Sequence, residues 1–312
     1  MLFDASIYDM ESKKGIKGAL TIDRKLDRIL REAFYLYYLL TPEQISRLLY
    51  TPSNLTTVES YLRDLLAHNY LYRFKFPTSE GKRPFIYTLA KEGRKYISNG
   101  EGLDKDVFYI PDGQEQRNYM RLIHFLELND FLIDAKLLEK KRKDIELFDM
   151  QHDVQLQKEP VIARTSEGKR VKVTPDGILE FRVRIGELKN KRVCVWVELD
   201  RGWHSIRSFK EKIHALLAIH STGVDVDRFG TDKIIYAFPT TAGDSRVEKM
   251  RMWTRQELGT VDKNSWINRM FCFAAVPALN DHKNMDVETL FCSSVWYMPY
   301  GESDEKRALI EL

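Results

Sequence analysis

Two short apolar segments that carry acidic residues constrain the fold of this chain more than any other feature. Residues 174–180 read Thr-Pro-Asp-Gly-Ile-Leu-Glu, and residues 195–200 read Val-Trp-Val-Glu-Leu-Asp. Side chains alternate between the two faces of a β-strand, so Glu198 and Asp200 share one face of the second strand. If the two strands are neighbours in a sheet, Asp176 converges with Glu198 and Asp200 at one end of it. Carboxylates gathered in this way repel each other unless they are protonated, paired with a cation or bound to a divalent metal.

The order of these residues is similar to the Pro-Asp…Glu-x-Lys signature of restriction-endonuclease-like nucleases. In such a site Asp176 and Glu198 would hold Mg²⁺, which activates water and stabilises the charge of the phosphorane. This chain departs from the signature because Asp200 stands at the lysine position. Asp200 is then a candidate third metal ligand, and all three acidic residues are candidate catalytic residues.

A basic side chain from elsewhere would have to replace the missing lysine. Arg201 is adjacent but is expected to point to the opposite face of the strand. Lys210 and Lys212 lie on the next predicted helix, and their spacing of two residues lets only one of them face the site. Two alternatives stay open: a degenerate nuclease fold used for binding or assembly, and acidic residues with structural roles. In the second alternative Asp176 caps a turn, and the other two pair with nearby basic residues: Arg201, His204 or Arg207.

The length of 312 residues predicts two domains. The chain is 43% hydrophobic and 30% charged, which is ordinary for a soluble globular protein, and no apolar run approaches the length of a membrane span. Three cysteines lie far apart in the sequence and no secretory signal is evident, so we expect a cytoplasmic protein. The net charge of +3 identifies no partner. Residues 63–95, however, hold eight basic residues against three acidic ones, a patch that can attract nucleic acid.

The N-terminal part predicts three helices and a hairpin. The first helix covers residues 22–40. The second begins after Thr41, where Thr-Pro-Glu-Gln supplies an N-cap, a proline at the first helical position and a capping box. The third covers residues 55–68, and two strands over 70–76 and 85–89 follow it. Three helices followed by a hairpin are the order of a winged helix-turn-helix domain.

The third helix is predicted to have one apolar side and one polar side. The polar side carries small hydroxyl residues and a guanidinium group, which suit phosphate oxygens and base edges, and two basic residues fall near the tip of the hairpin. The candidate DNA-binding residues are therefore Thr56, Thr57, Ser60, Arg63, Lys82 and Arg83. Winged helices also dock on proteins, and a charged helix face can simply be solvated, so both alternatives stay open.

A second domain is expected to follow a first domain at residues 20–98 and a linker at 99–113. A long helix over 114–142 opens this second domain, which extends to residue 312. Strands are expected at 161–164, 170–173, 177–183, 192–199, 233–238 and 270–276, and helices at 204–220 and 244–258. A helix, a run of strands, a helix and a further strand make an α-β-β-β-α-β core. The predicted class is α+β: a winged helix-turn-helix followed by an α/β mixed-sheet restriction-endonuclease-like domain.

Five short motifs occur in order along the chain. They read Arg-Pro-Phe-Ile-Tyr-Thr-Leu at 83–89, Lys-Glu-Gly at 91–93, His-Phe-Leu-Glu-Leu-Asn-Asp at 124–130, Pro-Asp-Gly at 175–177 and Glu-Leu-Asp-Arg-Gly at 198–202. In this combination the chain resembles the replication-relaxation family of plasmid and mobile-element proteins. The resemblance implies a winged-helix DNA-binding protein needed for plasmid replication or for relaxation of plasmid DNA. The family pattern itself is similar to Glu-x-Asp-Arg. The resemblance therefore implies that an aspartate, rather than the lysine of the nuclease signature, is expected at position 200.

The expected function is that of a sequence-specific, duplex DNA-binding protein that acts in replication or DNA relaxation of a plasmid or other mobile element. Its expected partners are double-stranded DNA and replication proteins, with no membrane, and a homodimer is one open alternative for its oligomeric state. Two other functions stay open. One is a Mg²⁺-dependent endonuclease that nicks or cuts near the binding site, and the other is a transcription regulator.

Overall fold

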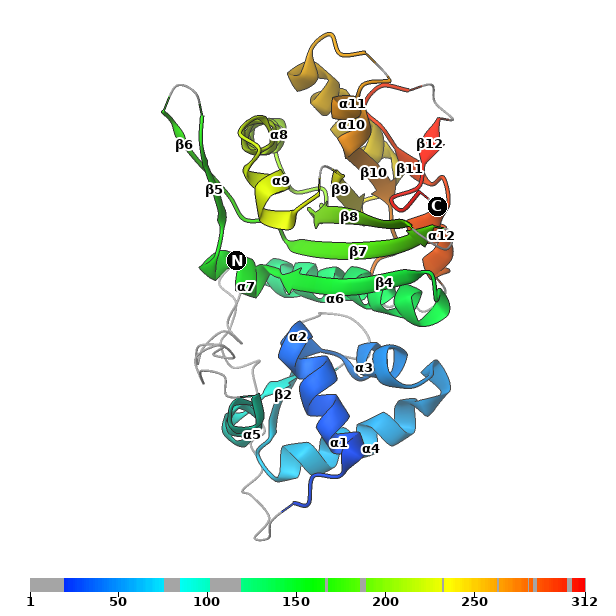
Figure 1. The fold of residues 1–312 in the computed structure, drawn as a ribbon. Coiled ribbons are helices and arrows are strands. Elements are labelled where there is room, and N and C mark those ends of the chain that lie inside the picture. Colours follow the sequence, from blue (N-terminus) through cyan, green and yellow to red (C-terminus); the bar gives the residue numbers. More distant parts are fainter. Residues whose placement is uncertain are drawn as a thin grey trace. The chain divides into compact units, whose positions relative to one another are not determined.

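The computed structural model divides the chain into two compact units, residues 1–133 and 134–312. The division falls inside one helix, α6 (Tyr119–Lys141), rather than in a loop (Figure 1). The structure describes residues 20–75, 85–101, 119–165, 168–185, 189–231, 233–262, 264–279, 281–282, 285–301 and 305–311.

The first unit contains short helices and a small antiparallel sheet with the strand order β1-β3-β2. Its strands are β1 (Leu39–Leu40), β2 (Leu71–Lys75) and β3 (Phe85–Leu89). A helical stretch with a central π-helical segment is formed by α1 (Arg24–Arg28), η2 (Ile29–Phe34) and α2 (Tyr35–Tyr37). The other helices are α3 (Pro42–Leu49), the 3₁₀ turn η3 (Pro52–Asn54), α4 (Leu55–Ala67) and α5 (Lys91–Glu101).

The start of α3 confirms the predicted capping box. The Thr41 hydroxyl accepts a hydrogen bond from the backbone N–H of Gln44, and the Gln44 side chain accepts one from the backbone N–H of Thr41. Pro42 occupies the first helical position, where its missing N–H leaves no bond unmade. Along α4, the predicted apolar side is buried, with Val58 and Leu62 fully inaccessible. These two features fix where α3 begins and which side of α4 faces outward.

Polar side chains of α6 are buried within the first unit, although the helix is largely apolar. Asn129 is fully buried and donates hydrogen bonds to the backbone carbonyls of Tyr37 and Leu39, at 3.0 and 2.6 Å. Arg47 of α3 and Asp130 form an ion pair with N and O atoms 2.5 Å apart. Buried polar groups are costly unless they are hydrogen-bonded, so these contacts specify how α6 packs against α3 and β1.

The second unit is built on a seven-stranded mixed sheet with the order β12-β11-β10-β9-β8-β7-β4. The β8–β9 and β9–β10 pairs are parallel and the other pairs are antiparallel. The strands are β4 (Ile145–His152), β7 (Gly177–Ile185), β8 (Lys189–Val197), β9 (Ile234–Thr240), β10 (Phe271–Ala275), β11 (Trp296–Tyr297) and β12 (Lys306–Arg307).

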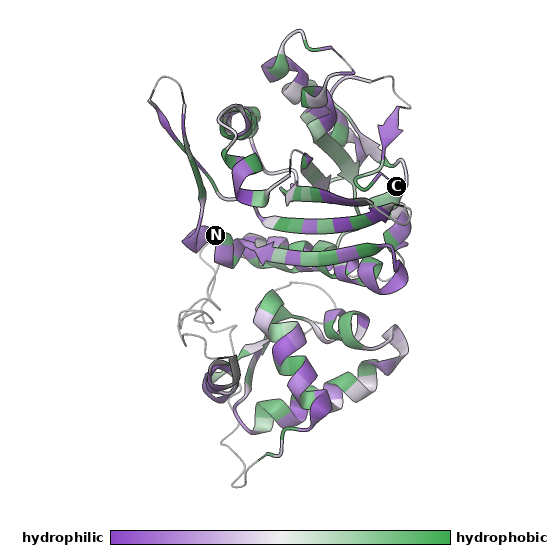
Figure 2. Ribbon diagram, viewed as in Figure 1, coloured by the Kyte–Doolittle hydropathy of each residue, from purple (hydrophilic) through white to green (hydrophobic). Residues whose placement is uncertain are grey.

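Helices α8, α9 and α10 pack on one face of this sheet, where they enclose an aromatic core around Trp196, Tyr236 and Phe238 (Figures 1 and 2). On the opposite face, Phe291 of α12 contacts Phe181 of β7, with ring centroids 5.8 Å apart. The helices of this unit are α7 (Asp153–Lys158), α8 (Ile206–Ser221), α9 (Val224–Phe229), α10 (Asp244–Leu258), α11 (Trp266–Met270) and α12 (Val287–Cys292).

Two of the predicted strands lie outside the large sheet. The strands β5 (Val161–Arg164) and β6 (Arg170–Val173) pair only with each other and form a separate two-stranded ribbon. In the large sheet the strands between α6 and α8 are β4, β7 and β8, so the predicted run of strands is wrong in part: β4 stands where β5 and β6 were expected. Strand β4 was not predicted from the sequence. This edge strand contains a register shift between Leu147 and Asp149, which interrupts the alternation by which a strand is recognised.

Loss of one partner of the Arg47–Asp130 pair should destabilise the first unit. In Arg47→Met, Asp130 keeps a buried charge without its guanidinium partner, so we expect the free energy of unfolding to fall by about 3–5 kcal/mol. The double variant Arg47→Met/Asp130→Leu removes both charges and should recover most of that loss. Urea unfolding followed by circular dichroism measures the difference, and equal stabilities of the single and double variants would contradict the argument.

Candidate functional site

The predicted acidic residues lie where β7, β8 and β9 meet. Strands β7 and β8 are antiparallel neighbours, with Gly177 opposite Val197. The Asp176 carboxylate accepts a hydrogen bond from the backbone N–H of Leu199 at 2.9 Å, which links the loop before β7 to the end of β8. Glu198 and Asp200 continue from β8 and donate backbone hydrogen bonds to residues of β9. Sheet pairing therefore brings the three acidic residues to one end of the sheet.

Lys212 of α8 is the basic side chain that reaches this acidic end. Its ammonium group forms an ion pair with Glu198, whose side chain is 2% exposed. Burial lowers the pKa of Lys212, but the nearby carboxylates, Glu198 first and Asp176 next, outweigh burial and raise the pKa above its usual value. Lys210, the other predicted replacement, instead pairs with Glu257 at 2.8 Å. The helix thus directs Lys212 and not Lys210 to the site, in agreement with the prediction that the two cannot both face it.

Asp200 is held by Arg246 in the first turns of α10. The guanidinium Nε and Nη2 donate to the two carboxylate oxygens, each at 2.8 Å, and Gly202 and His204 add further hydrogen bonds. Burial alone would raise the pKa of Asp200, but the hydrogen bonds from His204 and Arg246 and the charge of Arg246 hold it well below its usual range. The pairing with His204 is one of the structural alternatives considered from the sequence, whereas Arg207 pairs with Glu211.

The donor set suits a divalent cation in part. Mg²⁺ is commonly bound through one or two carboxylates together with water, and Asp176 and Glu198 provide such a pair. Both oxygens of Asp200 already accept hydrogen bonds from Arg246, so this residue is poorly placed to act as a third ligand. A cavity of about 10 Å³ lies beside Glu198 and Lys212, which is at the lower limit for one water molecule. A cation would therefore require the Lys212 ammonium to move.

Within the described part of the chain, no group of three His, Cys, Asp or Glu side chains is arranged to hold a metal ion. The roles of Asp176, Glu198 and Asp200 as metal ligands or catalytic residues stay predictions. What the geometry establishes is a carboxylate–lysine cluster, defined here as Asp176, Glu198 and Lys212, braced by the Asp200–Arg246 pair.

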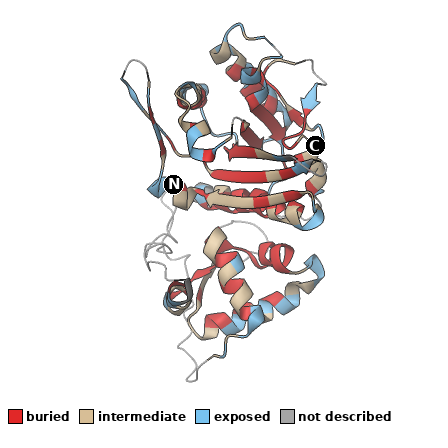
Figure 3. Ribbon diagram, viewed as in Figure 1, coloured by how far each residue is buried: buried red, intermediate tan, exposed pale blue. Residues whose placement is uncertain are grey.

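The predicted DNA-contacting side of α4 faces outward. Thr56, Thr57 and Arg63 are exposed and Ser60 is partly buried. Figure 3 shows that exposed and buried residues alternate along the helices of this unit. Lys82 and Arg83 lie outside the described residues, so their placement stays a prediction.

Two acidic residues accompany this polar side and were not among the residues predicted to contact DNA. Glu59 and Asp64 are both exposed on α4. With Arg63 as its one basic residue, α4 has a net charge of −1 and by itself offers no net attraction to phosphate.

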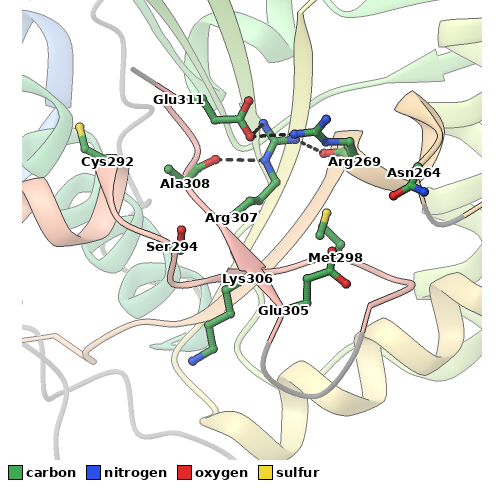
Figure 4. Close-up of a pocket in the computed structure, with 10 residues that line it drawn as sticks. All are labelled: Asn264, Arg269, Cys292, Ser294, Met298, Glu305, Lys306, Arg307, Ala308 and Glu311. Atoms are coloured by element: carbon green, nitrogen blue, oxygen red, sulfur yellow. Dashed lines mark hydrogen bonds and ion pairs between the residues drawn. The ribbon is translucent and has the colours of Figure 1, made fainter.

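A second cavity, of about 610 Å³, lies away from the carboxylate–lysine cluster, beside β12 and the C-terminal segment (Figure 4). Its arginines are already paired with one carboxylate: Arg269 and Arg307 contact Glu311 at 3.2 and 3.1 Å. None of the residues predicted from the sequence to form a site lines this cavity. These two ion pairs account for the charges of Arg269, Arg307 and Glu311.

The fold and the site define a two-unit α+β protein whose large mixed sheet carries a carboxylate–lysine cluster at one end. The chain belongs to the replication-relaxation family, whose sequence model matches residues 35–232, and this confirms the family identified from the sequence motifs. No curated protein and no solved structure matches the chain. Among the described residues, no helix is both long enough and apolar enough to cross a membrane.

Breaking the Asp200–Arg246 pair should cost stability at neutral pH. In Asp200→Asn the buried guanidinium loses its charged partner, and we expect the free energy of unfolding to fall by about 3–5 kcal/mol. Because the pKa of Asp200 is lowered on folding, its contribution is present above the ordinary value of 3.8 and is lost as the pH falls further. Urea unfolding between neutral and acidic pH should therefore show the gap between wild type and variant closing at low pH.

The exposed pair formed by Arg207 and Glu211 supplies the control for this measurement. Glu211→Gln removes a carboxylate whose side chain is 65% exposed, so the expected loss is below about 1 kcal/mol. A loss in Asp200→Asn no larger than in Glu211→Gln would show that the buried pair does not brace the site.

Proposed function

We propose that this chain binds duplex DNA and acts in the replication or relaxation of a plasmid or other mobile element. Membership of the replication-relaxation family supports the biological role. The observation that carries the DNA-binding part is the division of α4 into a buried apolar side and an exposed polar side. That polar side presents Thr56, Thr57 and Arg63, and Ser60 is partly accessible.

In this proposal the first unit acts as a winged helix-turn-helix. Helix α4 follows α3 through the short η3 turn and would serve as the recognition helix, with its hydroxyl and guanidinium groups toward phosphates and base edges. The strands β2 and β3 would form the wing. Because Glu59 and Asp64 offset Arg63, the basic residues Lys82 and Arg83 between these strands would supply the attraction to the DNA backbone.

Removal of one charge from α4 and one from the wing tests this interface. Arg63→Ala/Lys82→Ala should weaken duplex binding and reduce the slope of log affinity against log salt by about 0.9 for each phosphate that the variant no longer neutralises. The matched control is Lys91→Ala/Lys95→Ala, which removes the same charge from α5. Fluorescence anisotropy over a salt series measures both quantities. Equal effects in the two double variants would contradict a specific role for α4 and the wing.

A second candidate function is metal-dependent DNA cleavage, and the observation that favours it is Lys212. The ammonium group reaches the acidic end of the sheet from α8 and so restores the charge that is missing at Asp200. Asp176 and Glu198 would hold the metal, which when bound supplies an activated water and electrostatic stabilisation of the phosphate. Lys212 would leave its ion pair with Glu198 and donate a hydrogen bond to a phosphate oxygen.

A supercoiled-plasmid assay separates cleavage from binding. With Mg²⁺ or Mn²⁺, the cleavage proposal expects wild type to convert supercoiled DNA to open circles, and Asp176→Ala and Lys212→Met to lose this activity. Both variants should retain duplex affinity. Lys210→Met is the control, since Lys210 pairs with Glu257 away from the cluster. Wild-type binding without any nicking would contradict the cleavage function and favour a degenerate nuclease fold.

A further inference from the structure

We propose that the β5–β6 ribbon is a second DNA-contacting element, which inserts its basic face into the major groove of duplex DNA beside the carboxylate–lysine cluster. This inference rests on the proposed function as a duplex DNA-binding protein. It adds a surface in the second unit that is independent of α4. Figure 1 shows the ribbon next to α8 and α9, separate from the large sheet.

The two faces of the ribbon differ in chemistry. One face is apolar and anchored, since Val161, Ala163 and Val173 are buried in the core beneath α8. The other face of the ribbon is exposed to solvent (Figure 3). The strand register places Ile162 opposite Lys172 and Arg164 opposite Arg170. Cross-strand partners share a face, so the exposed face presents these residues together: Ile162, Arg164, Arg170 and Lys172.

The exposed face of the ribbon has a net positive charge among the residues that the structure describes. None of Arg164, Arg170 and Lys172 forms an ion pair with any residue that the structure describes. By contrast, two arginines of the neighbouring large sheet do have acidic partners: Arg182 pairs with Glu146 and Arg192 with Glu180, both at 3.1 Å.

Arg164 and Arg170 stand directly opposite each other in the ribbon. Like charges at cross-strand positions are destabilising, and a bound polyanion would relieve the repulsion. In the unbound protein this repulsion lowers the stability of the ribbon, and contacts to phosphates would offset it.

The dimensions of the ribbon suit the major groove. Four residues per strand extend over about 13 Å, and the two strands lie about 4.8 Å apart. The major groove of B-form DNA is about 12 Å wide and about 8.5 Å deep, and it admits a two-stranded ribbon. Flexible basic side chains on the exposed face could then reach the phosphates on either side, while Ile162 supplies an apolar contact to the groove floor.

The ribbon is also joined directly to the carboxylate–lysine cluster. Strand β6 ends at Val173, and Asp176 follows after two further residues. Helix α8 contacts both strands of the ribbon and carries Lys212. A duplex docked on the exposed face would lie across the ribbon from α8, and the chain that continues from β6 to Asp176 links this docking surface to the acidic end of the sheet.

The test uses the full chain with three charges removed from the exposed face: Arg164→Gln/Arg170→Gln/Lys172→Gln. Fluorescence anisotropy with a labelled duplex over a salt series should show an affinity loss of about tenfold or more. The salt slope should fall by about 0.9 for each phosphate that the ribbon no longer neutralises. Thermal unfolding should show no loss of stability, because the substitutions remove the repulsion between Arg164 and Arg170. The control, Lys143→Gln/Lys249→Gln/Lys306→Gln, removes the same charge from exposed positions elsewhere in the second unit and should bind like wild type.

The possible results of these measurements distinguish a failure of the ribbon inference from a failure of the proposed DNA-binding function. Equal affinity and salt slope in the ribbon and control variants would overturn the ribbon inference, while weakened binding of Arg63→Ala/Lys82→Ala would leave the proposed function in place. Equal losses on duplex and on single-stranded DNA of the same sequence would overturn groove docking. No duplex binding by wild type would overturn both proposals.

Discussion

Asp200 and Arg246 form a buried, bidentate ion pair that joins the end of β8 to the first turns of α10. Arg246 also donates a hydrogen bond to the His204 carbonyl, so the loop between β8 and α8 is held by the same guanidinium group. That loop leads directly into α8 and determines where Lys212 emerges. The position of the carboxylate–lysine cluster therefore depends on the Asp200–Arg246 ion pair. Both carboxylate oxygens of Asp200 already accept hydrogen bonds from Arg246. In this arrangement Asp200 holds Arg246 and the loop before α8, whatever further role it has in the site.

The remaining carboxylates differ in their surroundings, and this difference bears on their chemistry. Glu198 is almost fully buried and is neutralised by Lys212, whereas Asp176 is only partly buried and accepts a backbone hydrogen bond from Leu199. A buried carboxylate needs a cation nearby, because an unpaired charge in the interior is very costly. In the unbound protein Lys212 meets that need. A divalent cation would have to compete with the ammonium group, so metal affinity and the mobility of Lys212 are linked.

Local sequence patterns predicted much of this architecture, and long-range packing determined the rest. The alternation along residues 174–180 and 195–200 identified two strands whose pairing gathers the acidic residues. The spacing of Lys210 and Lys212 excluded that both face the site, but it did not identify Lys212 as the one that does. Arg246 could not be assigned as the partner of Asp200, because its helix was predicted but nothing in its sequence indicates how that helix docks on the sheet. Similarly, β5 and β6 were recognised as strands, while their separation from the large sheet follows from packing against α8.

In the proposed function, the distribution of charge assigns different contributions to DNA affinity and DNA specificity to the two units. The outward side of α4 carries Arg63 with Glu59 and Asp64, a net charge of −1. It therefore adds no net attraction to phosphate, and its contribution would lie in contacts to base edges. The exposed face of the ribbon has basic residues without acidic partners among the described residues, which suits sequence-independent phosphate contact. Affinity for DNA comes mainly from phosphate contacts, whereas specificity comes from contacts to bases. In the proposed function the second unit would therefore contribute mostly to affinity and its salt dependence, and α4 would contribute mostly to the choice of site.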